Sequence, residues 1–311
     1  MYLYPRDGTT VQELIVNADA SMYQAKSAGK NQFAFYSKEL ADKNQRFIQI
    51  EVALKNVDYS EFSLFYMPQV DSQTGLVTGV EALIRWNSPS LGFVSPAEFI
   101  PIAEATGVFR QLDLWVIRKV LSDRAQLLGI LGSDARISIN ISAAQLNSGS
   151  FFLDLMLITQ QMNQSAKNLV LEITETFAAT MSETLSSNLS LLKQAGFELA
   201  LDDFGTGYSS IVQLLDYPID EVKIDKYMID RLGYQKGGMV KAMATFFKSF
   251  GYRVTAEGVE TQDQVEMLQR MDIDTLQGYF YSKPVPIHQL AEAIKVNKKG
   301  PEGPLTLIES N

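Results

Sequence analysis

The chain has 311 residues and a hydrophobic content of 46%, enough to bury one large core or two modest ones. Its net charge of −9 argues against a DNA partner, because non-specific duplex binding needs basic stripes that neutralise phosphates. It has no cysteine and one histidine, His288, which excludes disulfides, a cysteine nucleophile and thiolate or histidine-rich metal sites. Any metal must therefore be held mainly by oxygen, which points to magnesium, manganese or calcium.

The first forty residues read differently from the rest. Apolar residues at helical spacing run from Leu14 to Ala25 and end at Gly29, and a short strand around Phe33 follows. Segment 37–57 is polar with spaced apolar residues and predicts a connecting helix. The N-terminus is no secretory signal and the chain has no long apolar run. We therefore expect no membrane contact from this segment and a cytoplasmic location, with any membrane anchor upstream in the parent protein.

From about Glu61, short β-rich runs alternate with longer amphipathic segments. Eight strands are expected, near residues 62–69, 76–85, 137–141, 169–174, 198–203, 221–224, 253–257 and 275–279. Helices are expected near residues 96–105, 112–128, 152–163, 181–194, 209–214, 236–249, 262–271 and 287–296. This alternation predicts an α/β barrel of the (β/α)8 type, with an open doubly wound sheet as the alternative. The first two strands are joined by "DSQTGL", which is too short for a crossover helix, so this pair should be antiparallel.

Almost every expected strand ends in a charged or amide side chain. The carboxyl ends of barrel strands meet at one mouth, where active sites gather. Unpaired charges inside apolar runs are unfavourable, so the repetition of this pattern along the chain indicates a common site. The residues are Glu81, Arg85, Asn140, Glu172, Glu175, Asp202, Asp203, Lys223, Asp225, Glu257, Glu260 and Gln277.

Each of these residues, taken alone, also has a purely structural explanation. Glu81 could form a buried pair with Arg85, and Lys223 could be a solvated strand end. The adjacent Asp202 and Asp203 could be a helix cap and a turn residue. Taken together, the side-chain oxygens form a cage for hard divalent cations, in which Asp202 can bridge two ions. A two-metal oxygen site is well suited to phosphodiester hydrolysis.

Seven motifs occur in an order and at a spacing that resemble one family. They are "GVEALIRW", "ISINIS", "LEITET", "LDDFGTGYSS", "VKIDK", "AEGVET" and "LQGYFYSKP". Through them the chain resembles the EAL-domain family of cyclic di-GMP phosphodiesterases. The resemblance implies a modified TIM barrel with an antiparallel first strand and hydrolysis of cyclic di-GMP to linear pGpG. It also implies Mg²⁺ or Mn²⁺ as cofactor, two ions per site, with Ca²⁺ inhibitory.

The resemblance assigns a role to each site residue. The implied metal ligands are Glu81, Asn140, Glu172, Asp202, Asp203 and Glu257. The implied catalytic residues are Lys223, which would bind and polarise the attacking water, Glu257, Glu81 and Glu175, which would anchor the loop 203–210. The implied substrate contacts are Arg85, on a phosphate, Gln277, Met67 and Pro68. Asp225 and Glu260 would support the ligands from behind.

The chain departs from the family pattern at two places. The family often has a glutamine before the proline of its first-strand "YQP" motif, whereas Met67 precedes Pro68 here and Gln69 follows it. Substrate affinity or guanine placement is therefore expected to differ. Ser88 stands where the family has a histidine, in a loop without a catalytic role. The main alternative function is a catalytically weak cyclic di-GMP receptor that signals through a protein partner. A dimerisation scaffold and a different phosphodiester substrate are weaker alternatives.

The resemblance also divides the chain into segments. Residues 1–40 resemble the end of a GGDEF domain through "YPRDG" and "ADASMYQAKSAGKNQFAFY", although the cyclase signature itself is absent. We expect a C-terminal GGDEF-like remnant over 1–40, a linker helix over 41–58, the EAL phosphodiesterase barrel over 59–297 and a flexible tail over 298–311. A homodimer is the expected assembly.

Overall fold

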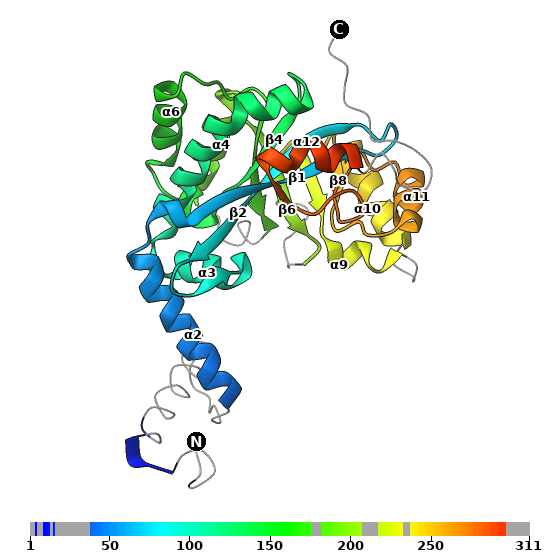
Figure 1. The fold of residues 1–311 in the computed structure, drawn as a ribbon. Coiled ribbons are helices and arrows are strands. Elements are labelled where there is room, and N and C mark those ends of the chain that lie inside the picture. The colour runs from blue at the N-terminus through cyan, green and yellow to red at the C-terminus, as the bar shows by residue number, and fades with distance from the viewer. Residues whose placement is uncertain are drawn as a thin grey trace. The chain divides into compact units, whose positions relative to one another are not determined.

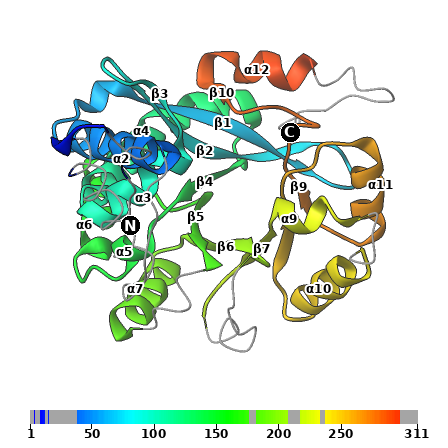
Figure 2. The ribbon, with the colours of Figure 1, turned by 90° about the horizontal axis from the view of Figure 1, so that it is seen from below.

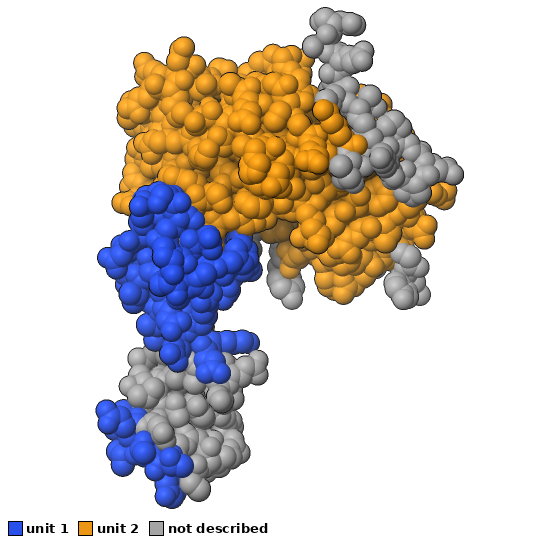
Figure 3. All heavy atoms as spheres, viewed as in Figure 1, with its two compact units in different colours: residues 1–61, 87–108 blue, residues 62–86, 109–311 orange. Residues whose placement is uncertain are grey.

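The computed structural model describes residues 38–175, 182–206, 217–232 and 237–296, with a few single positions among the first fifteen. The chain divides into two compact units (Figure 3): unit 1 is Met1–Glu61 with Asn87–Val108, and unit 2 is Phe62–Trp86 with Phe109–Asn311. Three expected features fall wholly or almost wholly outside the described residues. They are the helix and strand of the first forty residues, the helix at 209–214 and the tail 298–311.

Unit 1 contains the predicted connecting helix, α2 (Lys38–Lys55), and a short 3-10 turn at Tyr59–Glu61. Its second part holds strand β3 (Gly92–Val94) and helix α3 (Pro96–Thr106), which packs on α2. A proline suits the first position of α3 because the amide that it lacks would have no partner there. The helix ends at Gly107, whose φ of 76° favours glycine.

Unit 2 contains a barrel of eight strands, whose arrangement can be followed in Figures 1 and 2. Around the barrel the order is β1-β2-β4-β5-β6-β7-β8-β9, and β9 pairs with β1 to close it. β1 is antiparallel to both neighbours and the other pairs are parallel, which confirms the expected barrel with an antiparallel first strand. The strands are β1 (Phe62–Asp71), β2 (Val77–Ser88), β4 (Arg136–Asn140), β5 (Leu169–Thr174), β6 (Glu198–Phe204), β7 (Glu221–Ile224), β8 (Arg253–Ala256) and β9 (Thr275–Leu276). A short strand, β10 (Val285–Pro286), pairs with β1.

Helices lie on the outside of these strands (Figure 2). They are α4 (Phe109–Leu131), α5 (Ala143–Leu146), α6 (Phe151–Gln161), α7 (Glu183–Gln194), α9 (Lys226–Ile229), α10 (Gly237–Ser249), α11 (Gln262–Arg270) and α12 (Ile287–Val296). Helix α4 packs on β1 and β4, α7 on β6, α10 on β8 and α12 on β1. Among the helices of the described residues, none has the length and apolar character that crossing a membrane requires.

The predicted strands all occur, and their ends differ from the prediction by three residues or fewer. The reason is visible in β5, where five of six residues are buried, because a strand covered on both faces reads as a continuous apolar run. The last strand ends at Leu276, earlier than predicted, because the carbonyl of Gly278 accepts two turn hydrogen bonds. Two single-turn helices escaped prediction. Both begin at a capping side chain, Ser142 before α5 and Asp225 before α9.

A partly buried ionic network lies at the amino-terminal ends of the parallel strands, with Glu221 as its buried member. Arg136, the first residue of β4, pairs with Glu221 at the start of β7, and its Nε lies 3.2 Å from Glu198 Oε2. Arg253 pairs with both glutamates, and Thr255 Oγ1 donates to Glu221 Oε1 at 2.5 Å. Two arginines and two glutamates form four ion pairs here, so their charges balance at this end of the barrel.

Candidate active site

Lys223 lies at the centre of the opposite, carboxyl-terminal end of the barrel. It belongs to β7, its side chain is fully buried, and four carboxylates from four other parts of the barrel surround it. Its Nζ lies 2.7 Å from Glu172 Oε2, 2.8 Å from Glu257 Oε1, 3.1 Å from Asp202 Oδ1 and 3.8 Å from Glu81 Oε2. The sequence placed all five residues at strand ends, and the fold brings them together.

Two amide side chains hold Glu81 in place. Asn140 Nδ2, at the end of β4, donates to Glu81 Oε1 at 2.7 Å, and Gln277 Nε2, just after β9, donates to Glu81 Oε2. Met67 is the residue directly opposite Glu81 across the β1–β2 pair, and its sulfur lies 3.7 Å from Gln277 Nε2. Pro68, the next residue of β1, is buried. Met67 therefore borders the same group of side chains.

The carboxylates around Lys223 carry more negative charge than one ammonium can neutralise. Burial alone would lower the pKa of Lys223, but the surrounding carboxylates raise it well above its ordinary value, so the ammonium stays protonated. Burial raises the pKa of Glu172 and Glu257, and the neighbouring carboxylates add to this effect while Lys223 opposes it. Additional positive charge at the site would therefore be stabilising.

The donor set fits one or more hard divalent cations. Oxygens of Glu81, Glu172 and Asp202 lie within 4.8 Å of one another, as do oxygens of Asp202, Asp203 and Glu257. The two groups share Asp202. Glu172 Oε1 is buried and has no hydrogen-bond partner, an arrangement that leaves a lone pair available to a cation. Carboxylate and amide oxygens are the ligands that magnesium and manganese prefer.

A bulge in β6 explains how two adjacent aspartates reach the same site. Consecutive residues of a regular strand point to opposite faces. The pairing of β6 with β7 shifts register between Leu201 and Phe204, and Asp203 has a φ of 57°, in the left-handed region. The Asp203 amide also donates to Asp202 Oδ1 at 3.0 Å. Burial, followed by the charge of Asp202 and then of Asp225, raises the pKa of Asp203 to about 6.

Glu175 lies apart from this group, just beyond β5, and contacts the loop that follows β6. Its side chain is buried, and its Oε2 accepts a hydrogen bond from the amide of Gly205 at 3.0 Å. Residues 207–210 of that loop lie outside the described residues, so the anchoring of the loop 203–210 by Glu175 stays a prediction.

Arg85 lies on the same strand as Glu81, four residues further along β2. Its Nη1 donates to the carbonyl of Ile84 at 2.9 Å, and its guanidinium lies 5.5 Å from the centre of the Phe65 ring. Within the described residues no ion pair joins it to Glu81, so the purely structural explanation of that pair is wrong. Burial lowers the pKa of Arg85, while Tyr279 and Glu81 act in the opposite direction.

The side chains of Asp225 and Glu260 contact residues outside the group of carboxylates around Lys223. Asp225 Oδ1 accepts from the amide of Tyr227 at 2.7 Å and begins α9, although its charge still acts on Asp203. Glu260 Oε1 pairs with Lys226 Nζ at 2.9 Å at the surface. The Glu260 carboxylate thus contacts Lys226, and its supporting role behind the metal ligands stays a prediction.

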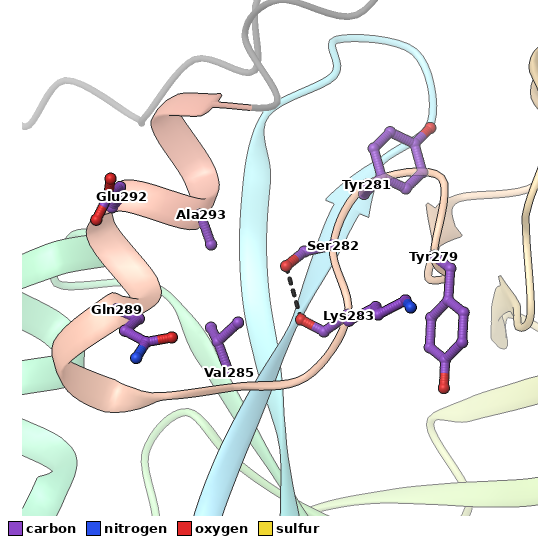
Figure 4. Close-up of a pocket in the computed structure, with 8 residues that line it drawn as sticks. All are labelled: Tyr279, Tyr281, Ser282, Lys283, Val285, Gln289, Glu292 and Ala293. Carbon is purple, nitrogen blue, oxygen red and sulfur yellow. Dashed lines mark hydrogen bonds between the residues drawn. The ribbon is translucent and has the colours of Figure 1, made fainter.

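A pocket of about 390 Å³, drawn in Figure 4, is lined by residues that follow Gln277 and by α12. Tyr279 is 57% exposed, and Lys283 Nζ lies 5.5 Å from the centre of its ring. Sequence reasoning assigned no role to these residues. The available signal was the run of three aromatic residues in "LQGYFYSKP", which contributed only to the family resemblance.

The EAL domain family matches residues 49–284, a span that contains every predicted site residue. The biofilm architecture maintenance protein MbaA of Vibrio cholerae is 39% identical over 291 residues, covering 93% of this chain and 36% of MbaA. NbdA of Pseudomonas aeruginosa, named a cyclic di-GMP phosphodiesterase, is 32% identical over 306 residues, covering 97% of this chain and 39% of NbdA. The chain thus spans less than half the length of either relative.

A solved structure is also similar. The MucR phosphodiesterase of Pseudomonas aeruginosa, in complex with c-di-GMP, superposes with a TM-score of 0.72 and 31% identity, covering 79% of this chain and 99% of that one. The family match extends over more than half of the chain and includes the barrel with its mouth. On this evidence, the chain belongs to the EAL domain family.

Proposed function

We propose that this chain is a metal-dependent phosphodiesterase that hydrolyses cyclic di-GMP to linear pGpG. The observation that carries the proposal is the group of four carboxylates around Lys223 at the barrel mouth. Family membership and relatives named for cyclic di-GMP support the choice of substrate. Because the chain covers only part of those relatives, the activity of the whole parent protein is part of the proposal.

We assign two divalent cations, Mg²⁺ or Mn²⁺, to the two overlapping groups of oxygens. Glu81, Asn140, Glu172 and Asp202 would hold one ion, and Asp202, Asp203 and Glu257 the other. When bound, such ions lower the pKa of water and stabilise charge on a phosphate. The excess of carboxylates over positive charge and the unpartnered oxygen of Glu172 support this assignment.

The remaining side chains donate hydrogen bonds and orient the metal ligands or the substrate. Lys223, with its raised pKa, serves as a buried hydrogen-bond donor that binds and polarises the attacking water. Asn140 and Gln277 fix the orientation of Glu81 through their amide hydrogens. Arg85 binds a substrate phosphate with its guanidinium, which a half-buried arginine beside the mouth can do in bidentate fashion.

Glu175 anchors the loop 203–210 through its hydrogen bond to Gly205, and we propose that this loop links the site to a homodimer contact. We also keep the proposed division into a GGDEF-like remnant over 1–40, a linker over 41–58, a barrel over 59–297 and a tail over 298–311. Relatives that align with 93% to 97% of the chain extend beyond the family match and support a shared N-terminal segment.

The second candidate is a cyclic di-GMP receptor with weak turnover. Met67 favours it, because a thioether beside Gln277 is a poorer hydrogen-bonding partner for a nucleotide than the amide that the family often has there. The intact carboxylates favour catalysis.

The experiment that decides is incubation of the purified chain with cyclic di-GMP in Mg²⁺, Mn²⁺, Ca²⁺ or EDTA, followed by chromatographic separation of the products. We expect pGpG in Mg²⁺ or Mn²⁺ and none in Ca²⁺ or EDTA. Intact cyclic di-GMP after long incubation with Mn²⁺ would refute the enzyme proposal. Tight nucleotide binding in the same samples would then identify the receptor.

A further inference from the structure

Two site residues, Glu257 and Gln277, are each followed at once by a glycine in the sequences "AEGVE" and "LQGYF". The residues after each glycine run side by side. The Val259 amide donates to the carbonyl of Gln277 at 3.0 Å, and the Phe280 amide donates to the carbonyl of Val259 at 2.9 Å. The segment 257–260 and the segment 277–280 are therefore joined by their backbones.

Gly278 lies in the middle of this junction. A Cβ atom placed on it would lie 2.0 Å from the oxygen, 2.2 Å from the nitrogen and 2.6 Å from the carbonyl carbon of Val259. Its φ is not in the left-handed region, so the backbone conformation does not require glycine. Glycine is required because the backbone of Val259 approaches this position too closely for a side chain. Any side chain at this position must push two backbones apart, since no flexible group is available to move.

Gly258 faces the other side of the same segment. A Cβ atom on it would lie 2.4 Å from Cβ and Cγ of Lys226 and 2.7 Å from its Cδ. The Lys226 ammonium is held by Asp230 at 2.8 Å and by Glu260 at 2.9 Å, so its stem is fixed over Gly258. The φ of Gly258 is 66°, which adds strain for other residues. The segment is thus held by backbone on one side and by a lysine stem on the other.

This arrangement fixes the carboxylate of Glu257 and the amide of Gln277 relative to each other. The Glu257 amide donates to the carbonyl of Ile224 at 3.0 Å, and its Oε1 lies 2.8 Å from Lys223 Nζ. The Gln277 amide donates to the carbonyl of Ala256 at 2.9 Å, and its side chain donates to Glu81. A displacement at Gly278 would therefore move both side chains.

We propose that Gly278, together with Gly258, is a positioning residue that sets Glu257 and Gln277 at the distance the site needs. The missing side chain of Gly278 is what brings the two segments into backbone contact. This inference rests on the proposed phosphodiesterase function for its kinetic consequence, but not for its effect on metal binding. A misplacement of about 1 Å can reduce a rate by about a hundredfold.

The test compares Gly278→Ala with two matched controls, Gly129→Ala and Gly238→Ala, where an added Cβ meets nothing within 4 Å. We expect kcat of Gly278→Ala to fall by about a hundredfold and KM to change by less than kcat, because the substrate contact of Gln277 is displaced but the phosphate contact of Arg85 is untouched. Both controls should keep wild-type kcat and KM. A purely structural role would lower the melting temperature and leave kcat unchanged at a temperature where the variant is folded.

Manganese binding gives a readout that needs no substrate. Calorimetric titration of the nucleotide-free protein should show weaker Mn²⁺ binding by Gly278→Ala than by wild type, and unchanged binding by both controls. If Gly278→Ala does not fold, Gly258→Ala takes its place, since its clash is with a side chain and not with backbone. Lys226→Gly in the same chain should then recover part of the lost kcat and Mn²⁺ affinity.

Wild-type kcat and wild-type Mn²⁺ affinity in the folded glycine variant would overturn the inference. Absence of turnover by the wild-type protein would instead refute the proposed function. In that case the Mn²⁺ titration alone decides the positioning role.

Discussion

Lys223 Nζ lies 2.7 Å from Glu172 Oε2, and the two side chains are 0% and 1% exposed. Water cannot screen this pair, and three further carboxylates lie within 4 Å of the same ammonium. A buried charge without a partner is strongly destabilising, so the balance at this point depends on how much positive charge the mouth contains. Removing Lys223 should therefore lower the stability of the protein, and adding divalent cations should raise it.

Lys223→Met should abolish turnover and destabilise the metal-free protein by about 3–5 kcal/mol, because it leaves four carboxylates without their buried partner. Added Mn²⁺ should restore more stability to this variant than to wild type. Thermal unfolding in EDTA and in Mn²⁺ measures both effects. Lys167→Met is the control, since its ion pair with Asp134 is largely exposed. An equal Mn²⁺ shift in Lys223→Met and wild type would contradict the account.

Glu81→Gln should keep the fold and lower kcat by at least about a hundredfold, because it removes one carboxylate of the first group without changing its size. The new amide would also meet the amide hydrogens of Asn140 and Gln277, which now donate to Glu81. Steady-state kinetics in Mg²⁺ and calorimetric titration with Mn²⁺ check this. Turnover within threefold of wild type would remove Glu81 from the proposed metal site.

Asp203→Asn should change the pH dependence of stability in EDTA. The folded pKa of Asp203 is raised to about 6, whereas an unfolded aspartate has a pKa of about 3.9. The folded protein holds this proton more tightly, so stability is lost as pH rises from about 4 to about 6. Asparagine keeps the neutral form and tolerates the φ of 57°, so the variant should be more stable than wild type above pH 6 and similar below pH 4.

Melting temperatures at pH 3.8, 5 and 7.5 measure this difference. A gain of stability that is the same at all three values would point to packing instead of charge. In Mn²⁺ at neutral pH the wild type should be more stable than Asp203→Asn, because the variant lacks a carboxylate that the proposed second ion uses.

The sequence was sufficient to predict most of the barrel and most of its mouth. Strands such as β5 are buried on both faces, so their positions follow from apolar runs, and charged residues such as Glu172 stand out within them. The central position of Lys223 could not be predicted, because it depends on how five segments of the barrel meet. The bulge at Asp203 could not be predicted either, because it depends on how β6 pairs with β7.

The partner of Glu260 could not be predicted for a similar reason. The motif "AEGVE" places two glutamates near each other in the sequence, but the backbone turns at Gly258, whose φ is 66°. Glu257 then points to Lys223, while Glu260 points to Lys226 at the surface. Sequence separation alone cannot distinguish these directions.

Arg136→Met should destabilise the protein by about 3–5 kcal/mol at pH 7, because Glu221 would remain buried without its main partner. Burial alone would raise the pKa of Glu221, but Arg136, the hydrogen bond from Thr255 and Arg253 lower it below its ordinary value. This contribution is present above the unfolded pKa of about 4.3 and is lost as pH falls through the folded pKa. In Arg136→Met the Arg136 charge no longer opposes the effect of burial, so the pKa of Glu221 is higher in the variant and the carboxylate takes up a proton as the pH falls. The loss caused by Arg136→Met should therefore shrink toward pH 4.

Urea unfolding at pH 7 and pH 4 measures this effect. Arg270→Met is the control, because its pair with Glu266 lies at the surface with the arginine 77% exposed, and it should change the free energy of unfolding by less than about 0.5 kcal/mol. A loss for Arg136→Met that is as large at pH 4 as at pH 7 would contradict the charge argument.

The central claim is that side chains from separate strands hold divalent cations at the barrel mouth. Crystals soaked in Mn²⁺, measured by anomalous scattering, test it most directly. We expect two anomalous peaks, one about 2.0–2.3 Å from oxygens of Glu81, Asn140, Glu172 and Asp202, and one at a similar distance from oxygens of Asp202, Asp203 and Glu257. A fully soaked crystal without an anomalous peak among these residues would contradict the account.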